Sequence, residues 1–386
     1  MSVPQTMTCV ELTGHGGLDK LRLRTDRPVP RPGRGEVLIA VTAAGVNNTD
    51  INTRTGWYNS GVRSGTTAEG AKEGFGAEGG ATGTDAMGDW SVALSFPRIQ
   101  GADCAGRIVA VGEGVDPARL GERIICAPYV LDPKDGTGLE SARFLGADFE
   151  GAFADFTVIA ARNAITVPHD LDVDDTALAT LPCSGGTAMN MVLLAGAKPG
   201  ELAIVTGASG GVGSFLVSIL KALGLEVVAV AGASKCEAVL ALGADHVLPR
   251  DATAPAQAFM EITGGRKADI ALDVVGGETF VWLIAALARG GRYVTAGAIA
   301  GPIVEFDLRS LYLKSLRLYG STVYGPDTMP TLVKLVTEGK VRPVAHATYP
   351  LAEIRTAQEA FLEKTHVGSL VLIPPRADHA KKDAPE

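Results

Sequence analysis

The sequence has few cysteines and few aromatic residues, and it has no surplus of positive charge. Its five cysteines among 386 residues are odd in number and scattered, so they predict free thiols in a reducing compartment rather than a disulfide framework. Lys and Arg total 35 against 43 Asp and Glu, which gives a net charge of −8. Without a basic stripe, nucleic acid and anionic membrane surfaces are poor candidates for the main partner.

Long apolar runs are also missing. No uninterrupted apolar stretch reaches the length of a membrane span, and the first residues lack the basic-then-apolar pattern of a secretion signal. Hydrophobic residues nevertheless make up 46% of the chain, which is long enough for two domains with sizeable cores. We therefore expect a cytoplasmic globular protein that acts on a small molecule, with no nucleic-acid or membrane partner.

A glycine-rich loop between a strand and a helix is the most informative segment. The apolar run Leu202–Val205 predicts a strand, residues 215–223 repeat apolar side chains at helical spacing, and Glu226–Ala231 predicts a second strand. Such a loop lets a pyrophosphate approach the backbone and the free N–H groups of the helix, whereas a purely structural glycine turn is the alternative. The residues predicted to bind a dinucleotide here are Ala208, Ser209, Gly210, Gly211, Val212 and Gly213.

The end of the second strand lacks a carboxylate. NAD-binding sites usually place an acidic residue there to accept a hydrogen bond from the ribose 2′-hydroxyl. Here Ser234 and Lys235 follow the strand, and a hydroxyl plus an ammonium suit a 2′-phosphate. Ser234 could also cap a helix over Lys235–Leu242, and both roles are compatible. The sequence therefore favours NADP over NAD.

Two different patterns divide the chain and predict an α/β fold. We expect residues 1–168 to form a β-rich catalytic domain and residues 169–320, where strands and helices alternate, to form a doubly wound parallel sheet. Residues 321–374 read as helix, strand, helix and strand, and are expected to return and complete the first domain. Residues 375–386 are polar and expected to be disordered. In the doubly wound part, the sequence predicts strands at 246–248, 270–275 and 292–296, and a helix at Thr279–Ala288 closed by Gly290 and Gly291.

One insertion stands apart from this organisation. Residues 59–89 are rich in Gly, Ala, Thr and Glu and show no apolar periodicity. A loop that long inside a compact domain is usually functional or disordered, so it is either a mobile active-site flap or a tolerated surface insertion. Because it offers little apolar surface, we expect its deletion to leave folding nearly intact.

Three blocks carry a resemblance to a known family. Residues 43–58, 200–213 and 307–320, with 366–372 near the end, resemble the medium-chain dehydrogenase/reductase superfamily and, within it, the zinc-independent quinone and enoyl reductases. The resemblance implies a GroES-like catalytic domain around a Rossmann domain, with the reaction in the cleft between them. It adds Thr187 to the expected cofactor-binding residues. We also expect a homodimer.

The resemblance also indicates which metal ligands are missing. Zinc alcohol dehydrogenases of the superfamily bind catalytic metal through a Cys, a His and a later Cys, and the matching residues here are Asn47, Ala102 and Cys183. Catalytic zinc needs three protein ligands, and Cys183 alone is retained. We therefore expect no metal, although residue type leaves open an improvised site of Asp103, Cys104 and Cys183.

Loss of the metal favours a different reaction. Hydride addition to an enone, enoyl thioester or quinone gives a delocalised enolate or phenolate, which hydrogen-bond donors and a proton source can stabilise without a Lewis acid. The block ending at Tyr58 is similar to that of enoyl reductases, in which the matching Tyr is the proposed proton donor; packing of the ring is the alternative. Asn47 could donate its amide to the substrate or to the nicotinamide ribose. Thr49 could relay a proton or bond the backbone, and Asp50 is expected to support the cleft through an arginine.

The leading prediction is an NADPH-dependent reductase of activated C=C bonds or quinones that works without zinc. One alternative is an alcohol dehydrogenase acting on a C–O bond, and another is a non-enzymatic, quinone-reductase-like structural or RNA-binding protein. One departure bears on the cofactor: the family's terminal His-x-Gly-Lys block has Ser369 in place of Lys, which removes a cation near the cofactor.

Overall fold

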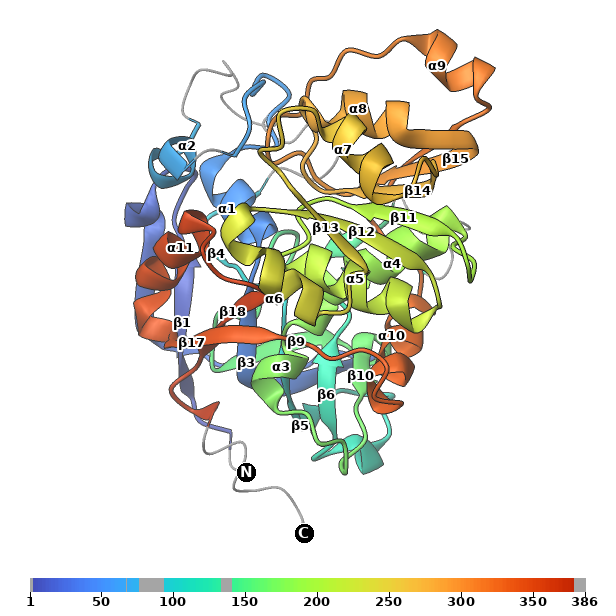
Figure 1. Ribbon diagram of the computed structural model, residues 1–386. Helices are drawn as coiled ribbons and strands as arrows, with labels where there is room; N and C mark the ends of the chain where they lie inside the picture. The colour runs from blue at the N-terminus through green and yellow to red at the C-terminus, as the bar shows by residue number, and fades with distance from the viewer. Residues whose placement is uncertain (1–2, 67, 76–93, 133–140, 378–386) are drawn as a thin grey trace.

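The computed structural model describes residues 3–66, 68–75, 94–132 and 141–377. A parallel sheet with helices on both faces forms one half of the molecule, and a mixed, mostly antiparallel sheet forms the other (Figure 1). In the described residues, no helix is long and apolar enough to cross a membrane.

The first half of the chain is rich in strands. They are β1 (Thr6–Leu12), β2 (Leu21–Pro28), β3 (Glu36–Val46), β4 (Arg98–Ile99), β5 (Ala105–Val111), β6 (Arg123–Cys126), β7 (Tyr129–Val130), β8 (Arg143–Phe144), β9 (Phe156–Ala160) and β10 (Ala164–Thr166). The helices of this part are α1 (Asn48–Thr55), α2 (Ala68–Glu73) and α3 (Asp175–Leu178). The mixed sheet has the order β10-β6-β5-β3 and continues into strands from the end of the chain.

Strands and helices then alternate, as the sequence predicts. They are α4 (Gly186–Ala195), β11 (Leu202–Val205), α5 (Gly211–Ala222), β12 (Glu226–Ala231), α6 (Cys236–Ala241), β13 (His246–Pro249), α7 (Pro255–Ile262), β14 (Ala268–Asp273), α8 (Thr279–Ala286), β15 (Leu287–Thr295), α9 (Leu308–Leu313) and β16 (Arg317–Gly320). The strands form a parallel sheet in the order β13-β12-β11-β14-β15-β16. The order reverses between β11 and β14, which is where doubly wound folds bind ligands. The predicted α/β fold class is confirmed.

The last segment of the chain returns to the first sheet. It contains α10 (Thr328–Thr337), β17 (Ala345–Pro350), α11 (Ile354–Glu363) and β18 (Ser369–Ile373). β18 pairs antiparallel with β3, and β17 pairs parallel with β18 (Figure 1). Leu351, Ile354 and Phe361 pack into the same core as β3. The return segment thus packs with the β-rich half, and it also reaches the glycine-rich loop, where the backbone N–H of Gly368 donates to the carbonyl of Ser209.

Two local predictions are wrong. The helix expected at Thr279–Ala288 ends at Ala286, because β15 begins at Leu287 and includes Gly290 and Gly291, where the pairing with β14 shifts register. Ser234 does not cap a helix, because it lies inside a 3₁₀ turn and α6 begins only at Cys236. Gly290 has a left-handed φ of +75°, so it forms a turn within the strand rather than a helix end.

The described part of the insertion is anchored, and residues 76–89 lie outside the described residues. Ala71 in α2 is fully buried, and its carbonyl accepts a hydrogen bond of 2.7 Å from Arg54 Nη2. The backbone N–H of Thr66 donates to the carbonyl of Ile299 in the parallel-sheet half at 2.9 Å. Removing this segment would take one of three acceptors from the buried Arg54 guanidinium, which also donates to Gln358 Oε1 and to the carbonyl of Gly16. A buried donor left unpaired is costly, so α2 contributes to folding, and the outcome of deleting residues 59–89 stays a prediction.

The disorder expected for residues 375–386 is wrong for the first three of them. The backbone N–H of Arg376 donates to Asp155 Oδ1 at 3.2 Å, and Ala377 is buried. Residues 375–377 therefore pack against the β-rich half, whereas residues 378–386 lie outside the described residues.

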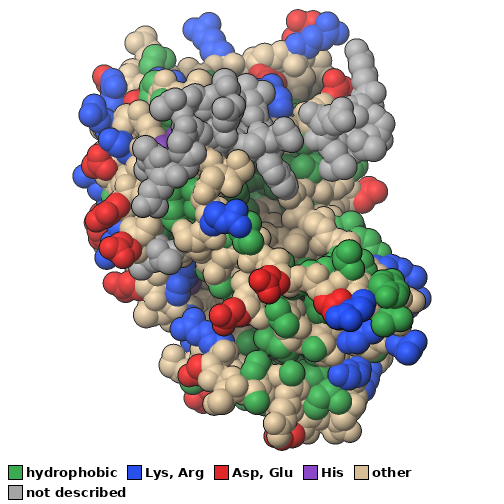
Figure 2. Space-filling view, turned by 90° about the horizontal axis from the view of Figure 1, so that it is seen from above, with side chains coloured by type: hydrophobic (Ala, Val, Ile, Leu, Met, Phe, Trp, Pro, Cys, Tyr) green, Lys and Arg blue, Asp and Glu red, His purple; other side chains and the backbone are tan. Residues whose placement is uncertain are grey.

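A group of large apolar side chains is exposed beside the edge strand β16. Leu308 is 66% exposed, Tyr312 63% and Leu313 60%, and all three belong to α9. Figure 2, which looks down on the end of the molecule where α9 lies, shows hydrophobic side chains gathered at the lower right of the view. The other exposed large hydrophobic residues of this region are Val281, Ile303, Val304 and Leu318. We call these seven residues the α9 patch.

Candidate active site

The glycine-rich loop joins the carboxyl end of β11 to α5 at the reversal of the parallel sheet. Gly207 has a left-handed φ of +57°, and a Cβ on Gly213 would lie 2.1 Å from the carbonyl oxygen of Gly207. Only glycine fits at both places, so the turn and the close backbone contact are built features. Ala208 tolerates a side chain because its φ is not left-handed. The loop presents the N-terminus of α5, whose first N–H groups have no partner within the helix, and it fits a pyrophosphate.

Two distant segments close over this loop. A Cβ on Gly211 would lie 2.5 Å from Ser184 Oγ and 3.0 Å from Ser369 Oγ. The backbone N–H of Gly368 donates to the carbonyl of Ser209 at 3.0 Å. The structure therefore brings together the loop, the start of α4 and the C-terminal segment, and Thr187 lies partly buried in the first turn of α4.

Asn47 links the loop to the β-rich half. Its Nδ2 donates to Asp103 Oδ2 at 2.7 Å, and its Oδ1 accepts from Ser184 Oγ at 3.0 Å. Its backbone N–H donates to Asp50 Oδ2 at 2.8 Å, which completes a capping box at the start of α1. These bonds leave one amide N–H of Asn47 for a ligand. Its role toward the substrate or ribose stays a prediction.

Among the residues that the structure describes, Asp50 has no arginine partner, so the expectation that it supports the site through an arginine is wrong. Its carboxylate accepts from backbone N–H groups, including that of Asn47. Burial raises the pKa of Asp50 to about 8 and that of Asp103 to about 7, and the charge of Asp103 raises the pKa of Asp50 further. The sequence signal was Asn-x-x-Asp before a helix, which is the spacing of a capping box.

Tyr58 and Thr49 come together beside Cys183 and Asp50. Tyr58 is 36% exposed, and its hydroxyl donates to Thr49 Oγ1 across a long 3.4 Å. Desolvation of the hydroxyl is the main cause that raises the pKa of Tyr58, and the neighbouring Cys183 and Asp50 add to it. A phenol is protonated at neutral pH even at its ordinary pKa, and desolvation keeps it so, which leaves the Tyr58 hydroxyl as a proton or hydrogen-bond donor. Its weak bond to Thr49 leaves the hydroxyl able to turn toward a ligand.

The three positions that hold zinc in related dehydrogenases do not fit the metal here. Ala102 has no donor atom, Asn47 already bonds Asp103 and Ser184, and burial raises the pKa of the Cys183 thiol well above its usual value. The improvised site is not formed either, because Asp103 accepts from Asn47 and from the backbone of Cys183. Across residues 3–66, 68–75, 94–132 and 141–377, no group of three or more His, Cys, Asp or Glu could hold a metal ion.

Lys235 lies at the other end of the loop. Its Nζ is 3.4 Å from Ser209 Oγ and 3.2 Å from the carbonyl oxygen of His366, and it also donates to the carbonyl of Lys364. Ser234 beside it is exposed. Arg250 lies near enough to lower the pKa of Lys235, an effect second to desolvation. No sequence motif indicated Arg250 or Lys364, whereas His366 begins the block 366–372 that carries part of the family resemblance; only the fold brings the three residues to this place.

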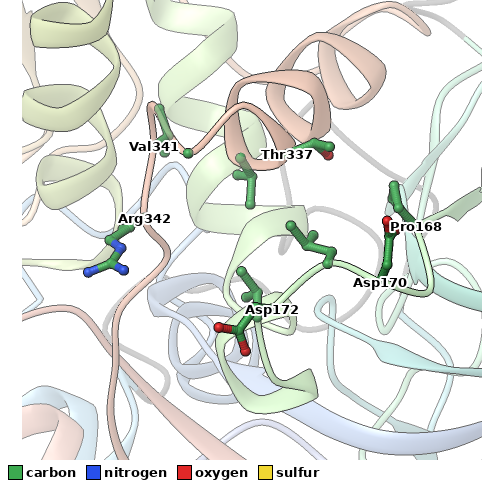
Figure 3. A pocket seen from close by; sticks show the side chains of 10 residues that line it. Pro168, Asp170, Asp172, Thr337, Val341 and Arg342 are labelled. Carbon is green, nitrogen blue, oxygen red and sulfur yellow. The ribbon is translucent and has the colours of Figure 1, made fainter.

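A groove of about 350 Å³ lies away from these residues. It is formed by the loop that contains Pro168, Asp170 and Asp172 and by the end of α10 with Val341 and Arg342 (Figure 3). None of the predicted site residues lines it. It is not part of the candidate active site.

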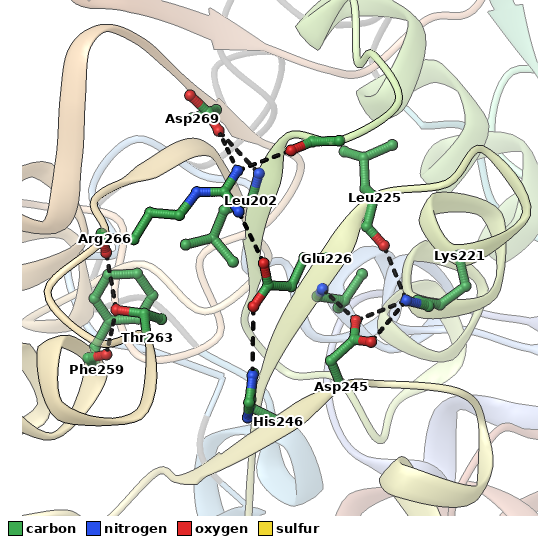
Figure 4. A network of polar contacts seen from close by, with 12 residues as sticks. Leu202, Lys221, Leu225, Glu226, Asp245, His246, Phe259, Thr263, Arg266 and Asp269 are labelled. Carbon is green, nitrogen blue, oxygen red and sulfur yellow. Dashed lines mark hydrogen bonds and ion pairs between the residues drawn. The ribbon is translucent and has the colours of Figure 1, made fainter.

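A polar network also lies outside the site, at the amino ends of the parallel strands. Arg266 bonds Glu226 at 2.8 Å and Asp269 at 3.3 Å, while Lys221 bonds Asp245 at 2.7 Å (Figure 4). Ion pairs this exposed contribute at most about 1 kcal/mol each. They support the strand register opposite the glycine-rich loop.

Comparison with known proteins agrees with this fold and site. Residues 77–169 match the alcohol dehydrogenase GroES-like domain, and residues 211–338 match the zinc-binding dehydrogenase family. The fold matches the crystal structure of a Sinorhizobium meliloti 1021 protein assigned as an alcohol dehydrogenase, with 42% identity, a TM-score of 0.84, and coverage of 96% of this chain and 97% of that chain.

Two relatives by sequence have different named activities. An acryloyl-coenzyme A reductase of Metallosphaera sedula is 29% identical over 72% of this chain and 84% of its own length. An NAD-dependent alcohol dehydrogenase of Sulfurisphaera tokodaii is 27% identical over 90% of this chain and 95% of its own length. Together with the sheet order and the glycine-rich loop, these matches show that the chain belongs to the medium-chain dehydrogenase/reductase superfamily, a family of oxidoreductases that bind nicotinamide cofactors.

Proposed function

We propose that this protein is an NADPH-dependent reductase that transfers hydride to an activated C=C bond or a quinone without a catalytic zinc. The observation that carries the proposal is the site itself: Tyr58 contacts Thr49 and lies near Cys183, and Asn47 and Ala102 replace two of the three zinc ligands of related dehydrogenases. The acryloyl-coenzyme A reductase relatives, whose name implies reduction of a C=C bond conjugated to a thioester, support it.

The proposed reaction needs a hydride donor and groups that stabilise the negative charge formed on the substrate. The bound nicotinamide supplies the hydride. The chain has to stabilise the enolate or phenolate that results and deliver a proton to it. Tyr58 can deliver that proton, and Thr49 holds the phenol in place through the 3.4 Å contact. The remaining N–H of Asn47 is a second donor toward the cleft, since Asp103 and Ser184 fix its amide.

A second candidate function is a dehydrogenase that acts on a C–O bond. The Sinorhizobium meliloti protein at 42% identity and the Sulfurisphaera tokodaii relative favour it, because both are assigned as alcohol dehydrogenases. The residues at the three zinc positions argue against this function. Oxidation of an alcohol passes through an alkoxide, whose localised charge is usually stabilised by zinc.

A screen separates the two candidate functions. The purified protein is assayed with enones, enoyl thioesters, quinones and alcohols, using both nicotinamide cofactors, before and after exhaustive chelation. We expect turnover of a C=C or quinone substrate with NADPH that survives chelation, and no stoichiometric zinc by metal analysis. One tightly held zinc per chain that is lost together with activity, or turnover of alcohols alone, would contradict the proposal.

Cofactor preference is tested at Lys235. Replacing it with methionine keeps the length of the side chain but removes the charge at the end of β12. We expect NADPH binding to weaken by about 1.5–3 kcal/mol, the range for a hydrogen bond to a charged group, while NADH binding changes little. Fluorescence titration measures both. Equal affinity of the wild type for NADH and NADPH would refute the preference.

We also propose a homodimer formed through the α9 patch. β16 has β15 as its only strand partner in the described part of the chain, so its other edge is open. Two copies related by a two-fold axis would pair these edges antiparallel and cover the patch on both. An apolar group of this kind beside an open edge is typical of an interaction surface.

The dimer is tested by placing charge in the patch. We expect the double variant Leu308→Glu, Tyr312→Glu to sediment as a monomer, because two carboxylates on each copy would be buried against their partners. Leu193→Glu, at an exposed apolar residue of α4, is the matched control and should stay dimeric. A monomeric wild type, or a dimeric double variant, would rule out this interface.

A further inference from the structure

Basic side chains gather beside the glycine-rich loop without acidic partners. Lys235, Arg250, Lys364 and His366 lie close enough that their charges act on one another, and His346 acts on His366. Within the described ranges, neither lysine forms an ion pair with a carboxylate. Buried or half-buried cations are normally paired, so this group lacks an anion.

Lys364 has the most constrained ammonium of the group. The residue ends α11 in the left-handed region, with a φ of +53°. Its Nζ donates to Asn48 Oδ1 at 3.0 Å and lies 3.7 Å from the centre of the Phe361 ring. An ammonium has three N–H donors, and one acceptor is present. Among the described residues no second oxygen or nitrogen accepts from this ammonium, and the Phe361 ring covers one side of it, so a ligand oxygen can take a remaining N–H.

The position of Lys364 is set by the segment that crosses the loop. The carbonyl of Lys364 accepts a hydrogen bond from Lys235 Nζ, and the same ammonium contacts Ser209 Oγ. Four residues after Lys364, the backbone N–H of Gly368 donates to the carbonyl of Ser209. The ammonium of Lys364 is held at the first turn of α1 by Asn48. The neighbouring Asn47 accepts a hydrogen bond from Ser184, and Ser184 lies against Gly211 at the start of α5. Lys235 thus lies toward the end of β12, and the Lys364 ammonium lies toward the start of α5.

We propose that Lys364 binds the diphosphate of the nicotinamide cofactor, supplying the cation that Ser369 does not. The inference rests on the proposed function only in that a nicotinamide dinucleotide is the cofactor; it depends neither on the 2′-phosphate nor on the reaction. In this assignment Lys235, which follows β12, is the residue proposed for the 2′-phosphate, and Lys364 is the residue proposed for the diphosphate at the helix N-terminus.

Unused hydrogen-bonding capacity beside Lys364 supports this site. The His366 side chain is 6% exposed, and its Nδ1 has no hydrogen-bond partner among the described residues. A buried polar atom without a partner is rare in a folded protein, and a phosphate oxygen would satisfy it. Desolvation and, after it, the charge of Lys364 lower the pKa of His366 to about 4, so the ring is neutral and can donate one N–H.

The charge state of Lys364 predicts how the affinity for a diphosphate depends on pH. Desolvation first, and the charge of Lys235 second, lower the pKa of Lys364 to about 7. A bound diphosphate stabilises the ammonium and raises that pKa, so above pH 7 the ligand has to bind together with a proton. Affinity for the diphosphate should therefore fall as the pH rises through and beyond 7.

Fragment binding separates the two phosphate positions. Calorimetry measures ADP-ribose, which has the diphosphate but no 2′-phosphate, and 2′-AMP, which has only the latter. We expect Lys364→Met to weaken ADP-ribose binding at least tenfold and to leave 2′-AMP binding within twofold. Lys235→Met should do the reverse. Lys334→Met, at an exposed lysine of α10, is the control for charge alone and should change neither.

The outcomes are distinct for the two proposals. Wild-type affinity of Lys364→Met for ADP-ribose, or an equal loss for both fragments, overturns the assignment of Lys364. A wild type that binds ADP-ribose but not 2′-AMP contradicts the NADPH preference and leaves Lys364 standing. Thermal unfolding of each variant shows whether a loss reflects the fold, and Lys364→Arg should restore ADP-ribose binding because it keeps the charge.

The pH signature uses the same ligand. From pH 7 to 9, the Kd of the wild type for ADP-ribose should rise, by up to about tenfold per pH unit, while Lys364→Arg stays flat because guanidinium does not titrate there. Lys235, His366, His346 and Arg250 face the same group, and Lys235→Met removes a charge that lowers the pKa of Lys364, so in that background the rise in Kd should begin at higher pH. A flat wild-type profile would overturn the proposal.

Discussion

Replacing Tyr58 with phenylalanine is expected to lower kcat for reduction of an enone or enoyl thioester by at least tenfold. General acid catalysis contributes about 10²–10⁴-fold, and water in a wet cleft can replace part of it. The phenol is protonated at neutral pH at its ordinary pKa, and desolvation shifts that pKa further upward, so the proton is present to be transferred. Single-turnover kinetics with NADPH measure the effect on the chemical step, and cofactor binding should be unchanged.

Tyr129→Phe is the matched control for that loss. Tyr129 lies close enough to Cys183 and Tyr58 for their charges to affect its pKa, but it packs edge-on against Tyr324 and does not belong to the motif of Tyr58. Its variant should keep the wild-type rate. If Tyr58→Phe also keeps the wild-type rate, Tyr58 is a packing residue and the proton comes from water or Thr49.

Gly213→Ala is expected to lower both stability and cofactor binding. In an ordinary helix this change is stabilising by up to about 1 kcal/mol, but here the new Cβ would lie 2.1 Å from the carbonyl oxygen of Gly207. Overpacking of this kind costs about 1–3 kcal/mol of unfolding free energy, and the loop has to move. Urea unfolding without cofactor and a titration with NADPH measure the two effects.

Gly210→Ala separates the two effects in the same loop. A Cβ on Gly210 would lie 3.4 Å from the same carbonyl oxygen, which is ordinary contact, and its φ of −79° suits any residue. We expect its unfolding free energy to stay close to that of the wild type, while binding of the pyrophosphate weakens. A Gly213→Ala variant that unfolds and binds as the wild type does would show that the close contact is not required.

Local patterns predicted the parallel-sheet half well. The strand limits at Leu202–Val205 and Glu226–Ala231 agree with β11 and β12, because both are apolar runs bounded by turns. The helix end at Thr279–Ala288 failed for a physical reason. The pair Gly290 and Gly291 is a turn signal, and only pairing with β14 shows that the turn lies inside a strand.

The site residues likewise divide into those that a local motif indicates and those that only long-range contacts bring to the site. The sequence indicated the glycine-rich loop and the unsuitable metal ligands Asn47 and Ala102, because motif and residue type are local properties. It did not indicate that the amide of Asn47 bonds Asp103 and Ser184, since those residues lie 56 and 137 positions away. It also did not indicate the hydrogen bond from Arg54 to the buried Ala71 carbonyl, because residues 59–75 have a low apolar content and show no periodicity.

The sequence by itself determined the α/β class, the dinucleotide loop and the loss of metal ligands, because these follow from periodicity, glycine spacing and side-chain chemistry along a short stretch. Only the tertiary structure decided what surrounds the loop. Lys364 bonds Asn48 across 316 residues, and β18 pairs with β3 across a similar distance. Contacts of this kind depend on how separate segments pack into one core, and no local pattern marks them.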